Sequence, residues 1–135
     1  MTASREATTA GAPGPPTDPV DLGVVLAGVD GDRDILAELI SVFLEDCPGQ
    51  LAKLTGTIER GDLEGAGERA HSLKGALGAV GAHAAHAGAA RLESLARAGD
   101  VAGLRSAASN VRAEVARVLT FLADRSLWQC GDAPR

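Results

Sequence analysis

The stretch from Asp62 to Gly81, DLEGAGERAHSLKGALGAVG, has the pattern of one amphipathic helix. Asp62 is a residue type that caps helix N-termini, and Gly81 interrupts the pattern at the other end. Between them, apolar side chains recur every three or four residues and so share one face of a helix. These residues are Leu63, Ala66, Ala70, Leu73 and Leu77. We therefore predict a helix with one buried stripe and one exposed face.

The same spacing continues on both sides of this stretch. An apolar stripe begins after Asp32 and runs to Gly61, and Pro48 is expected to end or kink it, giving one long helix or a bent pair. A further helix is expected before Gly99, and a last one from Val101 to about Asp124. The expected core positions of these helices are Ile35, Leu36, Leu39, Ile40, Phe43, Leu44, Leu51, Leu54, Ile58, Ala85, Ala89, Leu92, Leu95, Leu104, Val111, Val115, Val118, Leu119 and Leu122.

The connections between these helices are short and rich in glycine, which favours antiparallel neighbours. Asp18 and Pro19 have the residue types of an N-cap and a first helical position, so they should open a short extra helix. Strand-forming residues are scarce, and only 2% of the chain is aromatic. The predicted fold is all-α: an antiparallel up-and-down four-helix bundle with a short extra N-terminal helix.

The length of 135 residues fits one domain. Residues 1–17 are rich in Thr, Ala, Gly and Pro and are expected to be a disordered tail. Residues 18–125 should form the bundle. Residues 126–135 should form a C-terminal tail, from which Trp128 could pack back onto the bundle.

Charge and composition exclude several classes of function. The net charge is −5 and no basic cluster is present, which argues against nucleic-acid binding. No stretch has the roughly 20 apolar residues of a membrane helix, and no signal peptide is evident. Cys47 and Cys130 lack the spacing of a zinc site or a disulfide framework. A cytoplasmic protein without membrane or nucleic-acid partners is expected.

His71 lies on the exposed side of the predicted helix, away from its apolar stripe. Lys74 follows one turn later, within reach of a group attached to the imidazole. Gly75 and Gly78 each cost the helix about 1 kcal/mol relative to alanine. The close approach of a second protein to His71 would explain that cost. A neutral imidazole is a nucleophile near neutral pH and can carry a phosphoryl group.

The order of these residues resembles the phosphorylation motif of histidine phosphotransfer (HPt) domains. His71-Ser72-Leu73-Lys74-Gly75, then Gly81-Ala82, then Leu92-Glu93 match the family pattern at its spacings. The resemblance implies a four-helix bundle with His71 as phosphoryl acceptor, Lys74 balancing the added charge, and Gly75 giving access. It also implies that Glu93 could orient the imidazole and that Arg97 could add positive charge. Ala85 and Ala89 stand where the family commonly has larger residues, which should thin that helix interface.

On this resemblance, the expected function is that of a phosphorelay intermediate in two-component signal transduction. His71 would accept a phosphoryl group from a receiver-domain aspartate, of a hybrid sensor kinase or a response regulator, and pass it to another receiver. The chain would be a monomeric phosphocarrier, not an enzyme, without kinase activity or a cofactor of its own. The Mg²⁺ needed for transfer is expected on the partner receiver.

Three alternatives stay open at this point. The bundle could be an adaptor that binds a partner without phosphorylation, or a phosphate sink that loses the group to water. His83 and His86, with His71, invite a metal hypothesis, although no suitable set of ligands is evident. Glu93 could also pair only with Arg97, one turn away, rather than with the imidazole.

Overall fold

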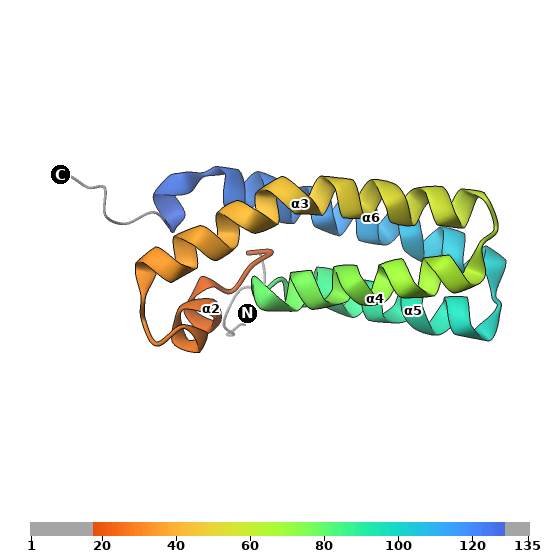
Figure 1. Ribbon diagram of the computed structural model, residues 1–135, viewed down its shortest axis with the longest axis horizontal. Coiled ribbons are helices and arrows are strands. Elements are labelled where there is room, and N and C mark those ends of the chain that lie inside the picture. The colour runs from red at the N-terminus through yellow and green to blue at the C-terminus, as the bar shows by residue number, and fades with distance from the viewer. Residues whose placement is uncertain (1–17, 129–135) are drawn as a thin grey trace, which may run out of the picture.

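The computed structural model describes residues 18–128, and within this range the chain forms helices and no strands (Figure 1). The expectations for residues 1–17, for Cys130 and for the rest of 129–135 fall outside the described residues. The helices are α2 (Leu22–Gly28), α3 (Arg33–Glu59), α4 (Leu63–Ala79), α5 (His83–Ala98) and α6 (Val101–Ala123), followed by the short 3₁₀ helix η2 (Arg125–Leu127).

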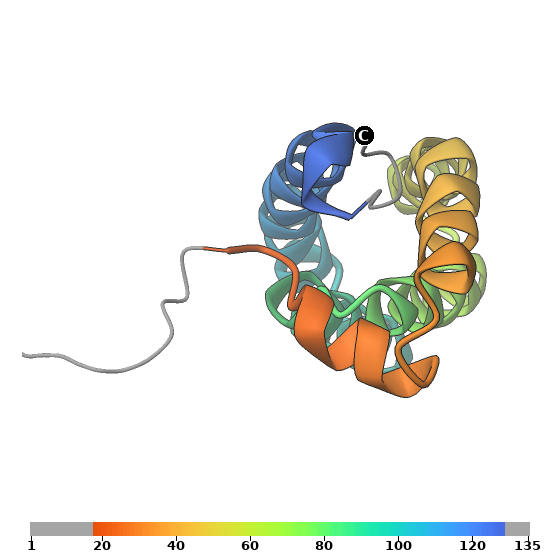
Figure 2. The same cartoon turned by 90° about the vertical axis from the view of Figure 1, so that its left-hand side faces the viewer.

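The four long helices run alternately up and down and form a bundle (Figures 1 and 2). Each packs against the next one along the chain, and α6 returns to pack against α3, which closes the bundle. The short α2 lies across one end, beside the start of α3 (Figure 1). The predicted fold class, an up-and-down four-helix bundle with a short extra N-terminal helix, is confirmed.

An aspartate side chain caps the start of three of the long helices. Asp32, Asp62 and Asp100 each accept a backbone N–H bond from the first turn of the helix that follows. Such caps satisfy amide groups that have no partner within the helix. Gly99 ends α5 in the left-handed conformation, with a φ of 75°. The predicted cap at Asp62 and the predicted end of a helix at Gly99 are therefore confirmed.

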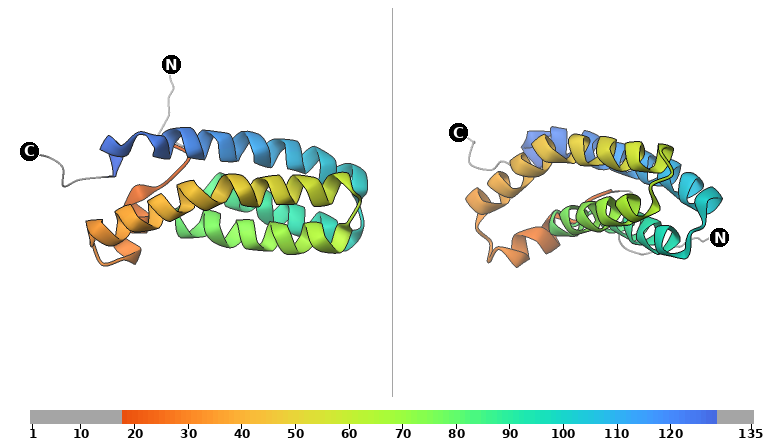
Figure 3. Two further views of the ribbon diagram at one scale, coloured as in Figure 1. Left: turned by 45° about the horizontal axis from the view of Figure 1, so that its top comes forward. Right: turned by 45° about the vertical axis from the view of Figure 1, so that its right-hand side comes forward.

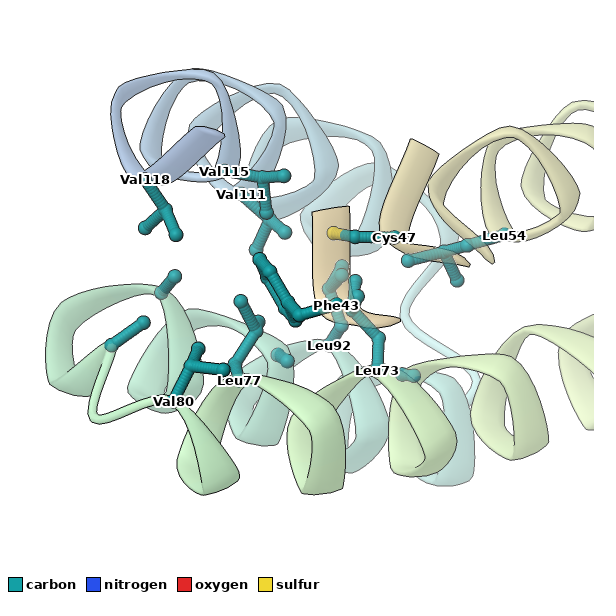
Figure 4. Close-up of a cluster of buried hydrophobic side chains, with 14 of the residues drawn as sticks. Phe43, Cys47, Leu54, Leu73, Leu77, Val80, Leu92, Val111, Val115 and Val118 are labelled. Atoms are coloured by element: carbon teal, nitrogen blue, oxygen red, sulfur yellow. The ribbon is translucent and has the colours of Figure 1, made fainter. Parts of the chain in front are cut away.

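The core is built mainly from aliphatic side chains, with the phenyl ring of Phe43 at its centre. Phe43 projects from α3 into the middle of the bundle, near Leu77 of α4 and Leu92 of α5 (Figure 4). Val111 and Val115 reach the same region from α6 (Figure 4). All of these side chains are buried, so the predicted apolar stripes of the four helices meet in one continuous core.

Helix α3 runs without interruption through Pro48, so the first of the two expected arrangements, one long helix, is confirmed and Pro48 does not end it. The buried positions Cys47 and Leu54 lie seven residues apart, on the same face of the helix. Pro48 itself points to solvent, and packing of the flanking turns stabilises the helix against the lost amide bond. Ile35 is also not a core residue: it lies in the first turn of α3 and is 49% exposed.

Helix α2 begins later than Asp18 and Pro19 predict. Its N-cap is Asp21, whose side chain accepts a bond from the backbone N–H of Val24. The backbone N–H of Asp21 in turn donates to the carbonyl oxygen of Gly81 at 2.9 Å. The start of α3 projects beyond the end of α4, and α2 lies between these two helix ends (Figure 3). Tertiary docking onto the α4–α5 turn therefore sets the start of α2.

The bundle continues to Trp128 rather than ending at residue 125. Trp128 is 1% exposed, and its indole N–H donates to the carbonyl oxygen of Leu122 at 2.8 Å. The segment that carries it turns inward from the end of α6 (Figure 2). The prediction that Trp128 packs back is thus confirmed, whereas the start of the tail at residue 126 is wrong because η2 and Trp128 belong to the folded unit.

Candidate functional site

His71 lies midway along α4, and its side chain is 66% exposed. The neighbouring residues Ala70 and Leu73 are fully buried in the core and fix the rotation of the helix. Successive residues of an α-helix are rotated by about 100° around the helix axis. Because Ala70 and Leu73 face the core, His71 lies away from the core, on the side of α4 that faces α5. The predicted exposure of the imidazole is therefore confirmed.

Three basic side chains contact the carboxylate of Glu93, which lies on α5. Its Oε2 lies 3.0 Å from His71 Nδ1 and 2.6 Å from Arg97 Nη2. Its Oε1 lies 2.8 Å from Lys74 Nζ. The carboxylate is 7% exposed, so it is held between α4 and α5 rather than in solvent. Glu93 therefore contacts both the imidazole and Arg97, so the alternative in which it pairs only with Arg97 is wrong.

These contacts determine the charge state of the carboxylate. The hydrogen bond from Lys74 holds the pKa of Glu93 below its ordinary value, and His71 and Arg97 act in the same direction. Burial opposes them by raising the pKa, but the bonds from the basic groups prevail. Glu93 is accordingly ionised at neutral pH and can accept a hydrogen bond from Nδ1–H of the neutral imidazole.

The two glycines near His71 differ in their surroundings. At Gly75, a Cβ atom would meet nothing within 4 Å, so the surface one turn after His71 is bare. At Gly78, a Cβ atom would lie 3.1 Å from Cδ2 of His86, so the missing side chain also makes room for this ring. The sequence predicted Gly78 only as an access residue and gave no sign of its contact with α5.

A hollow of about 680 Å³ lies beside His71, and the sequence alone did not reveal it. It forms where α4 and α5 face each other through small residues: a Cβ atom at Gly67 would lie 3.6 Å from Cβ of Ala96. Its lining residues are Leu63, Glu64, Gly67, Glu68, His71, Ser72, Ala96 and Arg97. The pairing of Gly67 with Ala96 across two helices depends on the tertiary register, which a single sequence does not show.

Small residues also fill the remaining interface between α4 and α5. Ala85 and Ala89 are 1% and 0% exposed, so they are close-packed although their side chains are short. On the opposite side of α5, a Cβ atom at Gly88 would lie 2.9 Å from Val111 of α6. The close approach of α5 to its neighbours is therefore built from alanine and glycine, and it brings Glu93 within hydrogen-bonding distance of α4.

Other candidate groups lie apart from this site. No group of His, Cys, Asp or Glu side chains within residues 18–128 is arranged to hold a metal ion, so the metal hypothesis for His83 and His86 gains no support. Cys47 is buried in the core, and burial raises the pKa of its thiol to about 11. Across the same residues, no helix has both the length and the apolarity to cross a membrane.

Comparison with known proteins adds one finding. The family model of the Hpt domain matches residues 38–121, which is more than half of the chain and includes all of α4 and α5. No curated protein and no solved structure gives a significant match. The helical bundle, the exposed histidine and this match agree. The chain belongs to the Hpt domain family, whose members take part in histidine phosphotransfer in two-component signalling and interact with receiver domains.

Proposed function

We propose that this domain is a phosphorelay intermediate that accepts a phosphoryl group on His71 from one receiver aspartate and donates it to another. The observation that supports this proposal most directly is the position of the imidazole. Its Nδ1 atom lies against Glu93 at 3.0 Å, while the side chain as a whole remains 66% exposed. Nε2 is therefore the ring nitrogen available to a partner.

The transfer step follows from this orientation. The Nε2 lone pair attacks phosphorus, the bond from phosphorus to the aspartyl oxygen breaks, and the receiver's aspartate leaves as a carboxylate. The proton stays on Nδ1, where Glu93 accepts its hydrogen bond and balances the positive charge that the ring gains. Donation to the second receiver is the same exchange in reverse, with that receiver's aspartate as the nucleophile.

Lys74 and the bare surface at Gly75 support the same role. Lys74 follows His71 by one turn, and its ammonium is anchored on Glu93 at 2.8 Å. From this position it is close enough to offset part of the charge of a phosphoryl group on the ring. Gly75 presents no side chain on the exposed face of α4, so the backbone of a receiver could come close to Nε2.

The remaining chemistry belongs to the partner. The described residues hold no metal-binding group, and Mg²⁺ would be supplied by the receiver, where it neutralises the phosphoryl oxygens during transfer. On this proposal the domain has no cofactor, no kinase activity and no turnover of its own. It would act as a cytoplasmic monomer, meeting receivers of hybrid sensor kinases and response regulators.

Incubation with a phosphorylated receiver tests the proposal. The wild-type protein should gain an acid-labile, base-stable label, and a second receiver should remove it. His71→Gln should gain no label. His83→Gln, which removes an exposed histidine from α5, should gain as much label as the wild type. An unlabelled wild type that still binds the receiver would indicate the adaptor alternative. Label that is lost to water before a second receiver can take it would indicate a phosphate sink.

A further inference from the structure

One oxygen of Glu93 is shared between the imidazole and a guanidinium group. His71 Nδ1 and Arg97 Nη2 both contact Oε2, at 3.0 and 2.6 Å, and the contact from Arg97 is the shorter. Lys74 occupies the other oxygen, Oε1. The carboxylate that contacts the imidazole is therefore shared with two cationic side chains.

This sharing matters because an orienting carboxylate has a drawback for a nucleophilic histidine. A carboxylate that accepts from Nδ1–H also stabilises the protonated ring. A protonated imidazole has no lone pair on Nε2 and cannot attack phosphorus. Cations bound to the same carboxylate partly neutralise its negative charge, so they weaken its stabilisation of the protonated ring. The carboxylate oxygen still accepts the hydrogen bond that orients the ring.

We propose that Arg97 is a positioning residue that acts through Glu93, holding Oε2 against His71 Nδ1 while limiting how strongly the carboxylate favours the protonated ring. The consequence for phosphoryl transfer rests on the function proposed above. The coupling between Arg97 and the imidazole does not, because it follows from the shared oxygen alone.

Other charged groups near the ring are accounted for on each element. On α4, Lys74 contacts Glu93, and Glu64 and Glu68 line the hollow that His71 also lines. On α5, the groups facing the ring are Glu93 and Arg97. The guanidinium side chain of Arg97 is 73% exposed, so solvent screens its direct field at the ring. Its effect should therefore pass mainly through the bond to Oε2.

Titration of His71 followed by nitrogen-15 NMR measures this coupling without any partner. In Arg97→Gln, the midpoint of the His71 titration should move to higher pH by about half a unit, a roughly threefold rise in the ratio of protonated to neutral ring at a given pH. Arg97→Lys should restore most of the difference. Arg91→Gln removes an exposed arginine from the same helix and should leave the midpoint unchanged.

Phosphoryl uptake gives the second measurement. The acid side of its pH profile should move to higher pH in Arg97→Gln, in step with the NMR midpoint. An unchanged NMR midpoint, or an equal shift in Arg91→Gln, would overturn the role of Arg97. Failure of the wild-type protein to accept a phosphoryl group would refute the proposed function but leave the NMR result standing, so the two failures are distinguishable.

Discussion

Truncation of Trp128 to alanine should remove a large share of the stability of the bundle. The indole is 1% exposed, and its N–H satisfies the carbonyl oxygen of Leu122 in the last turn of α6. Loss of a buried aromatic side chain costs about 3–5 kcal/mol. Domains of this size unfold with about 5–15 kcal/mol in total. At about 4 °C per kcal/mol, the melting temperature should fall by about 12–20 °C.

Thermal and urea unfolding followed by far-ultraviolet circular dichroism measures this loss, since the substitution removes the chain's one tryptophan and with it the fluorescence signal. Trp128→Phe keeps a buried ring but leaves the Leu122 carbonyl unsatisfied, which should cost about 1–3 kcal/mol. Leu127→Ala is the matched control, because Leu127 is 42% exposed and should cost about 1 kcal/mol or less. If Trp128→Ala unfolds like Leu127→Ala, the packing of the indole contributes little and the reasoning fails.

Three further substitutions have defined outcomes. Gly75→Ala should raise the unfolding free energy by up to about 1 kcal/mol, because the site is open, while slowing transfer from a receiver; equal transfer rates would contradict the access role. Gly81→Ala should lower the unfolding free energy by about 1–3 kcal/mol. The φ of Gly81 is 70°, which is unfavourable for alanine, and a Cβ atom would lie 2.8 Å from the carbonyl oxygen of Asp21. An unchanged urea midpoint would contradict this expectation. Folding lowers the pKa of Glu93, chiefly through the hydrogen bond from Lys74. Its contribution to stability is therefore fully present above the pKa of the unfolded chain and is lost as the pH falls through the lower pKa of the folded state. Glu93→Gln should therefore flatten the acid side of the stability profile, and a profile as steep as that of the wild type would exclude this contribution.

Much of the fold follows from local signals in the sequence. Asp62 caps α4 where the sequence predicts a cap, because capping depends on a few adjacent residues. Pro48 and Asp18 mislead for a shared reason. Each carries a strong local preference, and packing elsewhere decides the outcome: α3 continues through Pro48, and α2 starts where it docks on Gly81.

The site divides in the same way. The exposure of His71 follows from helical periodicity and could be predicted. The sharing of Oε2 between His71 and Arg97 could not, because it depends on how closely α5 approaches α4 and on the register between them. For the same reason, the sequence did not show that His86 lies against Gly78 or that Gly67 and Ala96 leave a hollow beside the ring.

Two cationic side chains, Lys74 and Arg97, contact the single carboxylate of Glu93, so these three groups together carry a net charge of about +1. A phosphoryl group adds about 1.5 to 2 negative charges near pH 7. Phosphorylation of His71 would thus more than offset the net positive charge of these three side chains. A phosphorylated receiver would therefore be repelled more strongly by the phosphorylated domain than by the unphosphorylated one. This difference in charge would favour encounters in which only one of the two partners carries the phosphoryl group.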